Sequence, residues 1–328
     1  MKRREFITLL GGAAAAWPVA ARAQQERMRR IGVLMNLAAD DPEALGRITA
    51  FVQGLQQLGW TDGRNVRIDA RWAAGNADNF RKYAAELIAL APDGILATST
   101  QAVTALQQAT HTVPIVFVLV TDPVGQGVIA SLARPGGNAT GITNVAAILA
   151  GKRLELLKEV MPRVTRVAVM WDPRAPGSTP QWDSSKQPAE KLRLRLYSME
   201  ASNVEDYVGA FKGAVRAHSQ AVSVTLNPVA NSNQKLIAEL AIDSGLPSIC
   251  ARGDYAENGC LIAYGPSYKT EGSDGARYVD RILKGAKPAE LPIAQPTIFE
   301  LVINLKTASR LGVTVPQSVL DRADKLVR

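Results

Sequence analysis

Two patterns of apolar residues alternate along the chain, and together they predict its secondary structure. Residues 115–120 form an unbroken apolar run that ends abruptly at Thr121-Asp122-Pro123. Short unbroken runs of this kind are typical of strands that are covered on both faces in parallel sheets. Residues 42–58 instead carry apolar side chains three and four positions apart, which is the spacing of an amphipathic helix.

The same alternation runs through the first half of the chain. Strand and helix patterns follow one another in the order β-α-β-α-β-α-β, which is the signature of a doubly wound parallel sheet. A further helix is expected to begin after the fourth strand. The predicted strands are 30–36, 66–72, 95–98 and 115–120, and the predicted helices are 42–58, 79–90, 101–109 and one from 128 to about 132.

The pattern starts again after the turn-rich segment 134–141, which is the best candidate for a domain boundary. We therefore predict an α/β protein of two doubly wound parallel-sheet lobes joined by hinge strands. Lobe 1 is expected to comprise 28–143 plus about 265–295, and lobe 2 to comprise 144–264 plus about 296–328, with a hinge crossover. The strands expected here are 167–171, part of 191–200, 221–226, 247–250, 261–264 and 299–304, and the helices 151–161, 203–217, 233–244, 272–283, 306–311 and 317–327.

The stretch between Pro180 and Pro188 fits this pattern poorly. A helix is expected there, but a proline in a helix interior removes a hydrogen bond and costs about 3 kcal/mol. Because proline is favoured at the first helical residue, we predict that the helix begins at Pro188. A bent helix is the alternative.

The first 23 residues have the features of an export signal. Arginines at positions 3 and 4 precede an apolar span, 7–20, that is too short to cross a bilayer as an anchor. Ala21-Arg22-Ala23 then fits a small-residue cleavage site. We predict a signal peptide, 1–23, of the twin-arginine type that is removed, and a mature chain in the periplasm with no membrane-spanning segment.

The net charge does not indicate a nucleic-acid partner. The whole chain carries +8, and the leader accounts for +3 of it, which leaves +5 spread over 305 residues. The basic residues form no stripe interleaved with aromatic side chains, so nucleic-acid binding is disfavoured. The two cysteines, Cys250 and Cys260, permit one disulfide in an exported protein, and the alternative is two small buried apolar residues on adjacent strands.

No catalytic or metal-binding motif is evident. The two histidines, His111 and His218, have no partner at metal-ligand or nucleophile spacing. The sequence contains no nucleophile-elbow motif and no Walker A motif. Gly125-Gln126-Gly127 lacks the third glycine of a dinucleotide-binding fingerprint. An enzyme is therefore the less favoured interpretation, and we expect no cofactor and no metal.

Polar residues do recur just after the predicted strands. In a parallel sheet they would share the edge where ligands usually bind, although each could simply cap the helix that follows. Hydroxyls and free N–H groups at a helix start suit a carboxylate, and acidic side chains suit an ammonium. This mixture predicts a small polar or zwitterionic organic ligand. The candidates are Asn36, Ser99, Thr100, Thr121, Asp122, Thr143, Asp172, Asn227 and Asp254.

Several motifs distributed over nearly the whole chain resemble one family. They are Arg3-Arg4-Glu5-Phe6-Ile7-Thr8-Leu9-Leu10-Gly11-Gly12, Thr121-Asp122-Pro123-Val124, Leu132-Ala133-Arg134-Pro135-Gly136-Gly137-Asn138 with Thr140-Gly141, Lys152-Arg153-Leu154-Glu155-Leu156-Leu157, Asn231-Ser232-Asn233, Ile282-Leu283-Lys284-Gly285-Ala286-Lys287-Pro288 and Phe299-Glu300-Leu301-Val302-Ile303-Asn304-Leu305-Lys306-Thr307. In combination they resemble the periplasmic substrate-binding proteins of ABC transporters, in the tryptophan/tyrosine-binding-like family.

The resemblance implies a type I periplasmic-binding fold whose lobes close around a ligand. It also implies a ligand of the amino-acid or aromatic-acid type and delivery to ABC permease subunits in the inner membrane. We expect a monomer. A periplasmic sensor that presents its ligand to a membrane receptor is the alternative function. The segment Cys250-Ala251-Arg252 departs from the aromatic and small residues that are usual there, so the pocket in lobe 2 is expected to differ.

Overall fold

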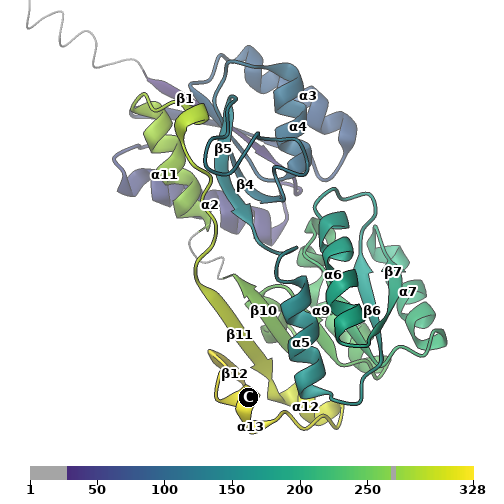
Figure 1. The fold of residues 1–328 in the computed structure, drawn as a ribbon. Coiled ribbons are helices and arrows are strands. Elements are labelled where there is room, and N and C mark those ends of the chain that lie inside the picture. The colour runs from purple at the N-terminus through teal and green to yellow at the C-terminus, as the bar shows by residue number, and fades with distance from the viewer. Residues whose placement is uncertain (1–27, 267–270) are drawn as a thin grey trace, which may run out of the picture.

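The computed structural model describes residues 28–266 and 271–328, and these form two α/β lobes (Figure 1). The sheet of lobe 1 has the strand order β2-β1-β3-β4-β5, and every neighbouring pair in it is parallel. Its strands are β1 (Arg29–Met35), β2 (Val66–Trp72), β3 (Gly94–Ala97), β4 (Ile115–Thr121) and β5 (Ala139–Asn144), and its helices are α2 (Pro42–Gln57), α3 (Ala77–Ala89), α4 (Thr100–Ala109) and α11 (Glu271–Leu283).

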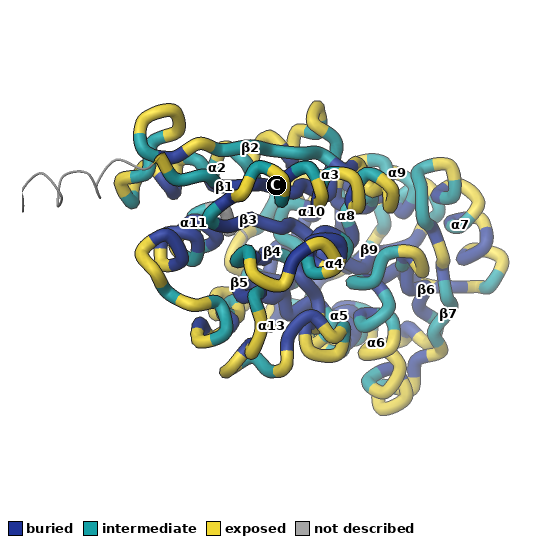
Figure 2. Tube along the Cα trace, turned by 90° about the horizontal axis from the view of Figure 1, so that it is seen from above, coloured by how far each residue is buried: buried dark blue, intermediate teal, exposed yellow. Residues whose placement is uncertain are grey.

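Helices cover both faces of this sheet, as the unbroken apolar runs predict. Phe80 of α3 and Leu106 of α4 belong to one buried cluster with Phe117 of β4. Phe51 of α2 belongs, with Val116 of β4, to a second buried cluster on the other side. Because successive residues of β4 point alternately into the two clusters, a strand in this position must be apolar throughout. Figure 2 shows the central strands of this sheet as buried along most of their length.

Lobe 2 is built on a larger sheet of order β12-β11-β10-β9-β8-β6-β7. It is parallel except between β10 and β11, which run antiparallel. The strands are β6 (Arg166–Trp171), β7 (Arg195–Glu200), β8 (Ala221–Val224), β9 (Ser248–Cys250), β10 (Ile262–Pro266), β11 (Phe299–Asn304) and β12 (Lys325–Val327), and the helices are α5 (Ala150–Val160), α6 (Thr179–Lys191), α7 (Val204–Arg216), α8 (Pro228–Ser232), α9 (Gln234–Asp243), α10 (Gly253–Glu257), α12 (Leu305–Arg310) and α13 (Gln317–Leu320). A short 3-10 helix, η1 (Pro288–Glu290), precedes β11.

Two α/β lobes built on parallel sheets confirm the predicted fold class. The chain leaves lobe 1 after β5 and re-enters it at α11, which packs against α2 and against strands of the first sheet. It crosses again before β11, since Ala294 bridges to Ile142 of β5 and Phe299 already pairs with Pro266 of lobe 2. Segments far apart in the sequence therefore lie side by side at the junction of the lobes.

Three local predictions are wrong. Residues 128–132 form turns rather than a helix, and the turn-rich segment before Asn144 contains β5, which the pattern of turn residues concealed. The end of the chain forms the short helix α13 and then β12, which extends the sheet of lobe 2 beside β11, in place of the predicted helix 317–327 (Figure 1). The cause is tertiary, because pairing with a neighbouring strand outweighs a weak local helix pattern.

The expected helix start at Pro188 is also wrong, because Pro188 lies inside α6. The ring is accommodated by a glycine on the neighbouring helix: a Cβ on Gly151 of α5 would lie 2.7 Å from the Cγ of Pro188. Ser185 Oγ donates a 2.8 Å hydrogen bond to the carbonyl of Gln181, one turn earlier. Packing against α5 thus places the proline in a position that its backbone preference disfavours.

Cys250 and Cys260 are joined by a disulfide, with their Cα atoms 6.6 Å apart. The bridge ties Cys250, the last residue of β9, to Cys260, two residues before β10, across the short helix α10. None of the described helices is both long enough and apolar enough to cross a bilayer. The predicted signal peptide, 1–23, lies outside the described residues.

Candidate functional site

A cavity lies between the two lobes at the carboxyl ends of the parallel strands. We call it the central cavity. Lobe 1 contributes the ends of β1, β3, β4 and β5 together with α2 and α4, and lobe 2 contributes the loops after β6 and β8 together with α8. Its lining residues are Asn36, Arg47, Thr98, Ser99, Thr100, Gln101, Leu119, Thr121, Asn144, Ala175, Pro176, Gly177, Ser178, Leu226, Asn227, Pro228 and Asn231.

The predicted binding residues do not all face this cavity. Five of them line it: Asn36, Ser99, Thr100, Thr121 and Asn227. Asp122 and Thr143 line a separate groove beside the crossover segments, which we call the hinge groove. Asp172 lines none of the described cavities, and Asp254 lines a third groove together with Arg252.

Asn36 is held at the end of β1 by the neighbouring strand. Thr98, just beyond β3, accepts a 3.0 Å hydrogen bond from the Asn36 main chain and donates a 2.7 Å bond to Asn36 Oδ1. The main-chain N–H of Thr98 donates in turn to the Leu34 carbonyl. Adjacent parallel strands thus fix this amide at the cavity wall, with only 3% of the residue exposed.

Ser99 and Thr100 have different roles. Ser99 is the N-cap of α4, and its hydroxyl accepts a 3.2 Å hydrogen bond from the N–H of Ala102. Thr100 is the first residue of that helix, and no described hydrogen bond involves its hydroxyl. The start of α4 therefore presents one side chain that is committed to the helix and one that is available to a ligand.

Thr121 is fixed through a bulge in β4. The pairing of β4 with β5 shifts register between Phe117 and Val120, and Leu119 has a φ of 62°. The carbonyl of Leu119 accepts a 3.0 Å hydrogen bond from Asn144 Nδ2. Asn144 and Thr121 also bond to each other, by distances of 2.8 and 3.0 Å. Protein contacts therefore occupy the polar groups of this pair, and Asn144 lines both the central cavity and the hinge groove.

Lobe 2 supplies two asparagines from α8, its N-cap Asn227 and Asn231 in its last turn. Asn227 Oδ1 caps the helix by accepting a 2.8 Å bond from the Ala230 N–H. Asn231 Oδ1 accepts a 2.9 Å bond from the buried hydroxyl of Tyr255. Burial raises the pKa of Tyr255 well above its ordinary value, so this hydroxyl remains protonated and remains a donor.

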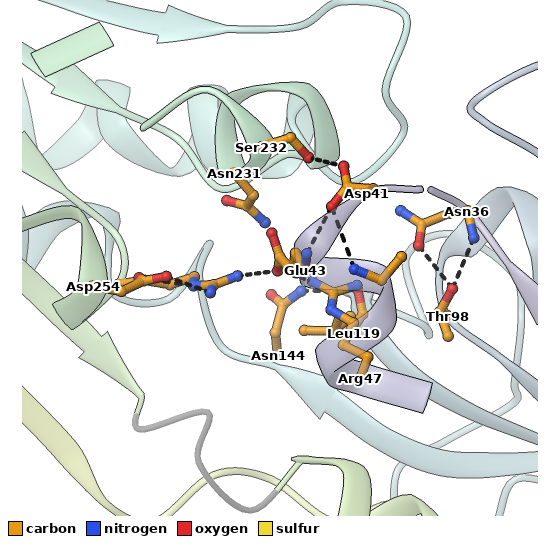
Figure 3. Close-up of polar contacts among 12 residues, drawn as sticks. Asn36, Asp41, Glu43, Arg47, Thr98, Leu119, Asn144, Asn231, Ser232 and Asp254 are labelled. Atoms are coloured by element: carbon orange, nitrogen blue, oxygen red, sulfur yellow. Dashed lines mark hydrogen bonds and ion pairs between the residues drawn. The ribbon is translucent and has the colours of Figure 1, made fainter. Parts of the chain in front are cut away.

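The charged groups at the cavity form a chain that spans both lobes (Figure 3). Glu43 Oε1 lies 2.5 Å from Nη2 of Arg47, on the same helix, and 2.5 Å from Nη1 of Arg252 in lobe 2. Arg252 also binds Asp254, which accepts a further bond from Gln234. Burial acts to raise the pKa of Glu43, but the two guanidinium groups outweigh it and hold that pKa below its usual range.

The three predicted acidic residues are engaged away from the central cavity. Asp122 is exposed and accepts a bond from the main chain of Gly125, within its own turn. Asp172 is buried, and its carboxylate accepts a bond from the hydroxyl of Ser202 in the same lobe. Asp254 is neutralised by Arg252. In this arrangement none of the three carboxylates is placed to meet a ligand ammonium in the cavity.

Among the described residues, hydrogen bonds join the lobes directly at three places. Ser232 donates to Asp41 at the start of α2, Arg252 binds Glu43, and Gln126 Nε2 donates a 3.2 Å bond to the carbonyl of Pro176. Each contact pairs a residue of lobe 1 with one of lobe 2. The structure is therefore a closed form, and the central cavity is enclosed from both sides.

Sequence reasoning missed Arg47, Asn144 and Asn231. Arg47 lies in the middle of a helix, where an arginine normally faces solvent, and no local signal marks it. Asn144 comes directly after the predicted Thr143. Asn231 belongs to the motif Asn231-Ser232-Asn233, which carries part of the family resemblance. Within the described part of the chain, no group of three or more His, Cys, Asp or Glu residues could hold a metal ion.

Comparisons with known proteins agree with this architecture. A tyrosine-binding protein of Clostridioides difficile (strain R20291) is 26% identical over 266 residues, which cover 80% of this chain and 75% of the relative. A solved structure from Vibrio cholerae, described as a conserved domain protein, is 28% identical with a TM-score of 0.85, covering 92% of this chain and all of the other. A structure from Streptococcus pneumonia, described as an ABC domain in complex with L-Trp, is 25% identical with a TM-score of 0.84 and the same coverage.

More distant solved structures of ABC transporter solute-binding proteins share the two-lobed fold. The expected type I periplasmic-binding fold is thereby confirmed. The family model for ABC transporter substrate binding proteins matches residues 31–327, which is almost all of the described chain. The chain therefore belongs to the family of ABC transporter substrate-binding proteins.

Proposed function

We propose that the mature chain is an extracytoplasmic receptor that encloses a small organic acid, of the amino-acid or a related carboxylate class, in the central cavity and delivers it to an ABC permease. The observation that carries this proposal is the cavity itself. It lies at the carboxyl ends of both sheets, is walled by both lobes, and contains buried polar groups without protein partners. The names of the relatives, which refer to tyrosine and L-Trp, support an amino-acid-sized ligand.

Ligand binding and lobe closure are coupled in this arrangement. A ligand that touches Asn36 and Thr100 in lobe 1 and Asn227 in lobe 2 makes its full set of contacts only when the lobes are together. Its binding free energy therefore favours the closed form over the open one. A permease that recognises the closed form would distinguish loaded receptor from empty receptor.

The experiment is a thermal unfolding screen of the mature chain against a panel of amino acids, hydroxy acids, oxo acids, polyamines and sugars. A ligand at one hundred times its Kd adds about 2.7 kcal/mol to the free energy of unfolding, which raises Tm by several degrees. A panel that produces no shift in any class would contradict the proposal.

A matched pair of variants ties the shift to the central cavity. A Cβ on Gly177 would lie 3.0 Å from Thr121 Oγ1, so Gly177→Leu should fill the cavity and abolish the ligand-induced shift. Gly209 is on the exposed face of α7 with no atom within 4 Å of a new Cβ, so Gly209→Leu should leave the shift intact. Equal shifts in the two variants would place binding elsewhere.

A further inference from the structure

Four buried asparagines line the described part of the central cavity, and three of them have the same orientation of their amides. In the fourth, Asn144, protein groups engage both the Nδ2 and the Oδ1. The oxygens of Asn36, Asn227 and Asn231 accept hydrogen bonds from Thr98 Oγ1, the Ala230 N–H and the Tyr255 hydroxyl. The three asparagines are 3%, 4% and 7% exposed. No described hydrogen bond uses their Nδ2 groups. Each amide therefore turns its acceptor toward the protein and leaves its N–H donors for whatever occupies the cavity.

The main-chain acceptors of the lobe 2 wall are occupied as well. Gln126 Nε2 donates to the carbonyl of Pro176. Gln181 Nε2 donates 2.8 Å bonds to the carbonyls of Gly177 and Leu226, while its own Oε1 accepts from the Leu226 N–H. One glutamine thus holds two lining loops together and uses oxygens that could otherwise accept from a ligand. The polar balance of the cavity shifts further toward donors.

The charge balance points the same way. Arg47 is the charged residue that lines the central cavity, and no Asp or Glu is among the described lining residues. Its Nη2 is bound to Glu43, and no described hydrogen bond engages its Nη1 or Nε. The second oxygen of Glu43 is enclosed, without surface accessible to a ligand. A ligand in the cavity therefore meets a guanidinium group and finds no carboxylate.

We propose, building on the receptor function above, that the ligand is a small carboxylate whose other polar groups accept hydrogen bonds, such as a 2-hydroxy or 2-oxo acid, and that the cavity has no ammonium site. An ammonium group would bring three donors to a wall on which Arg47 and the three amides also present donors. Buried donors without acceptors are costly, so the site discriminates against that group. A carboxylate satisfies Arg47 and the three amides together.

The dimensions of the cavity set the size of this acid. The volume open to the centre of a water molecule is about 50 Å³. A water molecule needs roughly 10–15 Å³ by the same measure, so the closed cavity has room for only a few water-sized groups. The described lining residues include no aromatic side chain that could pack against a ring. The closed form thus suits a short-chain acid better than an aromatic one.

The test is isothermal titration calorimetry of the full mature chain with ligands of one carbon skeleton. L-Lactate and pyruvate carry a carboxylate without an ammonium, L-alanine carries both, and L-alaninol carries the ammonium without a carboxylate. We expect lactate or pyruvate to bind at least tenfold more tightly than alanine, and alaninol not to bind. L-3-Phenyllactate, with the same head group, should bind more weakly than lactate.

Several outcomes would overturn the inference and leave the receptor function standing. These are alanine binding as tightly as its hydroxy acid, alaninol binding at all, or phenyllactate binding more tightly than lactate. If no member of the series binds and the broad panel yields a ligand that has an ammonium or lacks a carboxylate, the inference is likewise wrong. If the panel is empty too, the receptor function fails with it.

Two isosteric variants test the donors directly. Asn231→Asp keeps an oxygen for the Tyr255 hydroxyl but replaces the free N–H donors by a negative charge, so lactate binding should fall by more than tenfold. Asn76→Asp makes the same change at an exposed helix cap, where its oxygen still accepts from Asp78 and Asn79, and should leave binding unchanged. Equal affinities in the two variants would refute the proposed role of the amide donors.

Arg47 is tested in the same way. Arg47→Gln removes the guanidinium, and loss of a charge-assisted hydrogen bond predicts a decrease in lactate affinity of roughly ten- to a hundredfold. Arg277→Gln is the control, since Arg277 is an exposed arginine of lobe 1 that pairs with an acid one turn earlier on its helix. Unfolding curves of the ligand-free variants separate misfolding from lost binding. An Arg47→Gln protein that folds and binds lactate as the wild type does would contradict the assignment.

Discussion

The ion pair between Glu43 and Arg252 joins the two lobes, and its removal should shift the protein toward an open form. The two groups are mostly buried, with 16% and 13% of their side chains exposed, and their atoms are 2.5 Å apart. Screening by solvent is therefore weak, and Arg252→Gln should remove an interaction of about 2 kcal/mol. Glu43 keeps its bond to Arg47 in this variant, so no carboxylate is left buried without a partner.

That free energy acts on the equilibrium between closed and open forms. A loss of about 2 kcal/mol changes the equilibrium about thirtyfold toward the open form. The apparent Kd of the ligand should rise by up to that factor, because only the closed form makes contacts from both lobes. Small-angle scattering of the ligand-free protein should show a larger radius of gyration, and titration calorimetry should show the weaker binding.

The control for this prediction is Lys325→Gln. Lys325 also pairs with a carboxylate, Glu257, but both groups are about half exposed and belong to lobe 2. This variant removes the same charge without touching the junction of the lobes, so Kd and radius of gyration should match the wild type. If Arg252→Gln gives the same values as Lys325→Gln, the ion pair does not hold the lobes together and the reasoning is refuted.

Three further predictions follow from the same contacts. The lowered pKa of Glu43 means that the folded, closed protein stabilises its ionised form, so the contribution of Glu43 to stability is present near neutral pH and is lost as the pH falls through that pKa. The Tm difference between wild type and Glu43→Gln should therefore shrink toward zero in acid. A constant Tm difference from pH 7 to pH 3 would contradict this prediction. The disulfide between Cys250 and Cys260 closes a loop of sequence separation 10, and its reduction should lower the free energy of unfolding by roughly 2–3 kcal/mol. Urea unfolding with and without dithiothreitol measures this loss, and identical urea midpoints would contradict the chain-entropy account. Ser99→Ala should destabilise the fold by about 1 kcal/mol through loss of the α4 cap, whereas Ser99→Asp should retain most of the stability, and equal urea midpoints for the two variants would remove the cap from the explanation.

The architecture of the lobes follows from local pattern. Residues 115–120 are apolar at every position because helices cover both faces of β4, and this requirement is visible in the sequence. The strand β11 was also visible, as the predicted strand 299–304, but the edge strand β12, which pairs with β11 in parallel, had no such signal. Edge strands are short and half exposed, so their composition resembles that of the loops and helix ends around them.

The binding residues show where local pattern stops being informative. Thr121 and Asp122 are adjacent in sequence, but Thr121 lines the central cavity and Asp122 lines the hinge groove. The sequence predicts where a strand ends. The direction of each side chain at that end depends instead on the geometry of the turn, such as the φ of 47° at Asp122.

By itself the sequence determined that this is an α/β protein of two lobes with a polar rim at the strand ends, because burial of strands and capping of helices act between near neighbours. Only the tertiary structure decided which rim residues meet a ligand. Ser202 engages Asp172 from 30 residues away, and Arg252 reaches Glu43 from 209 residues away. These long-range partners occupy the acceptors and acids and leave the donors free, so the chemistry of the site is decided by contacts that no local pattern records.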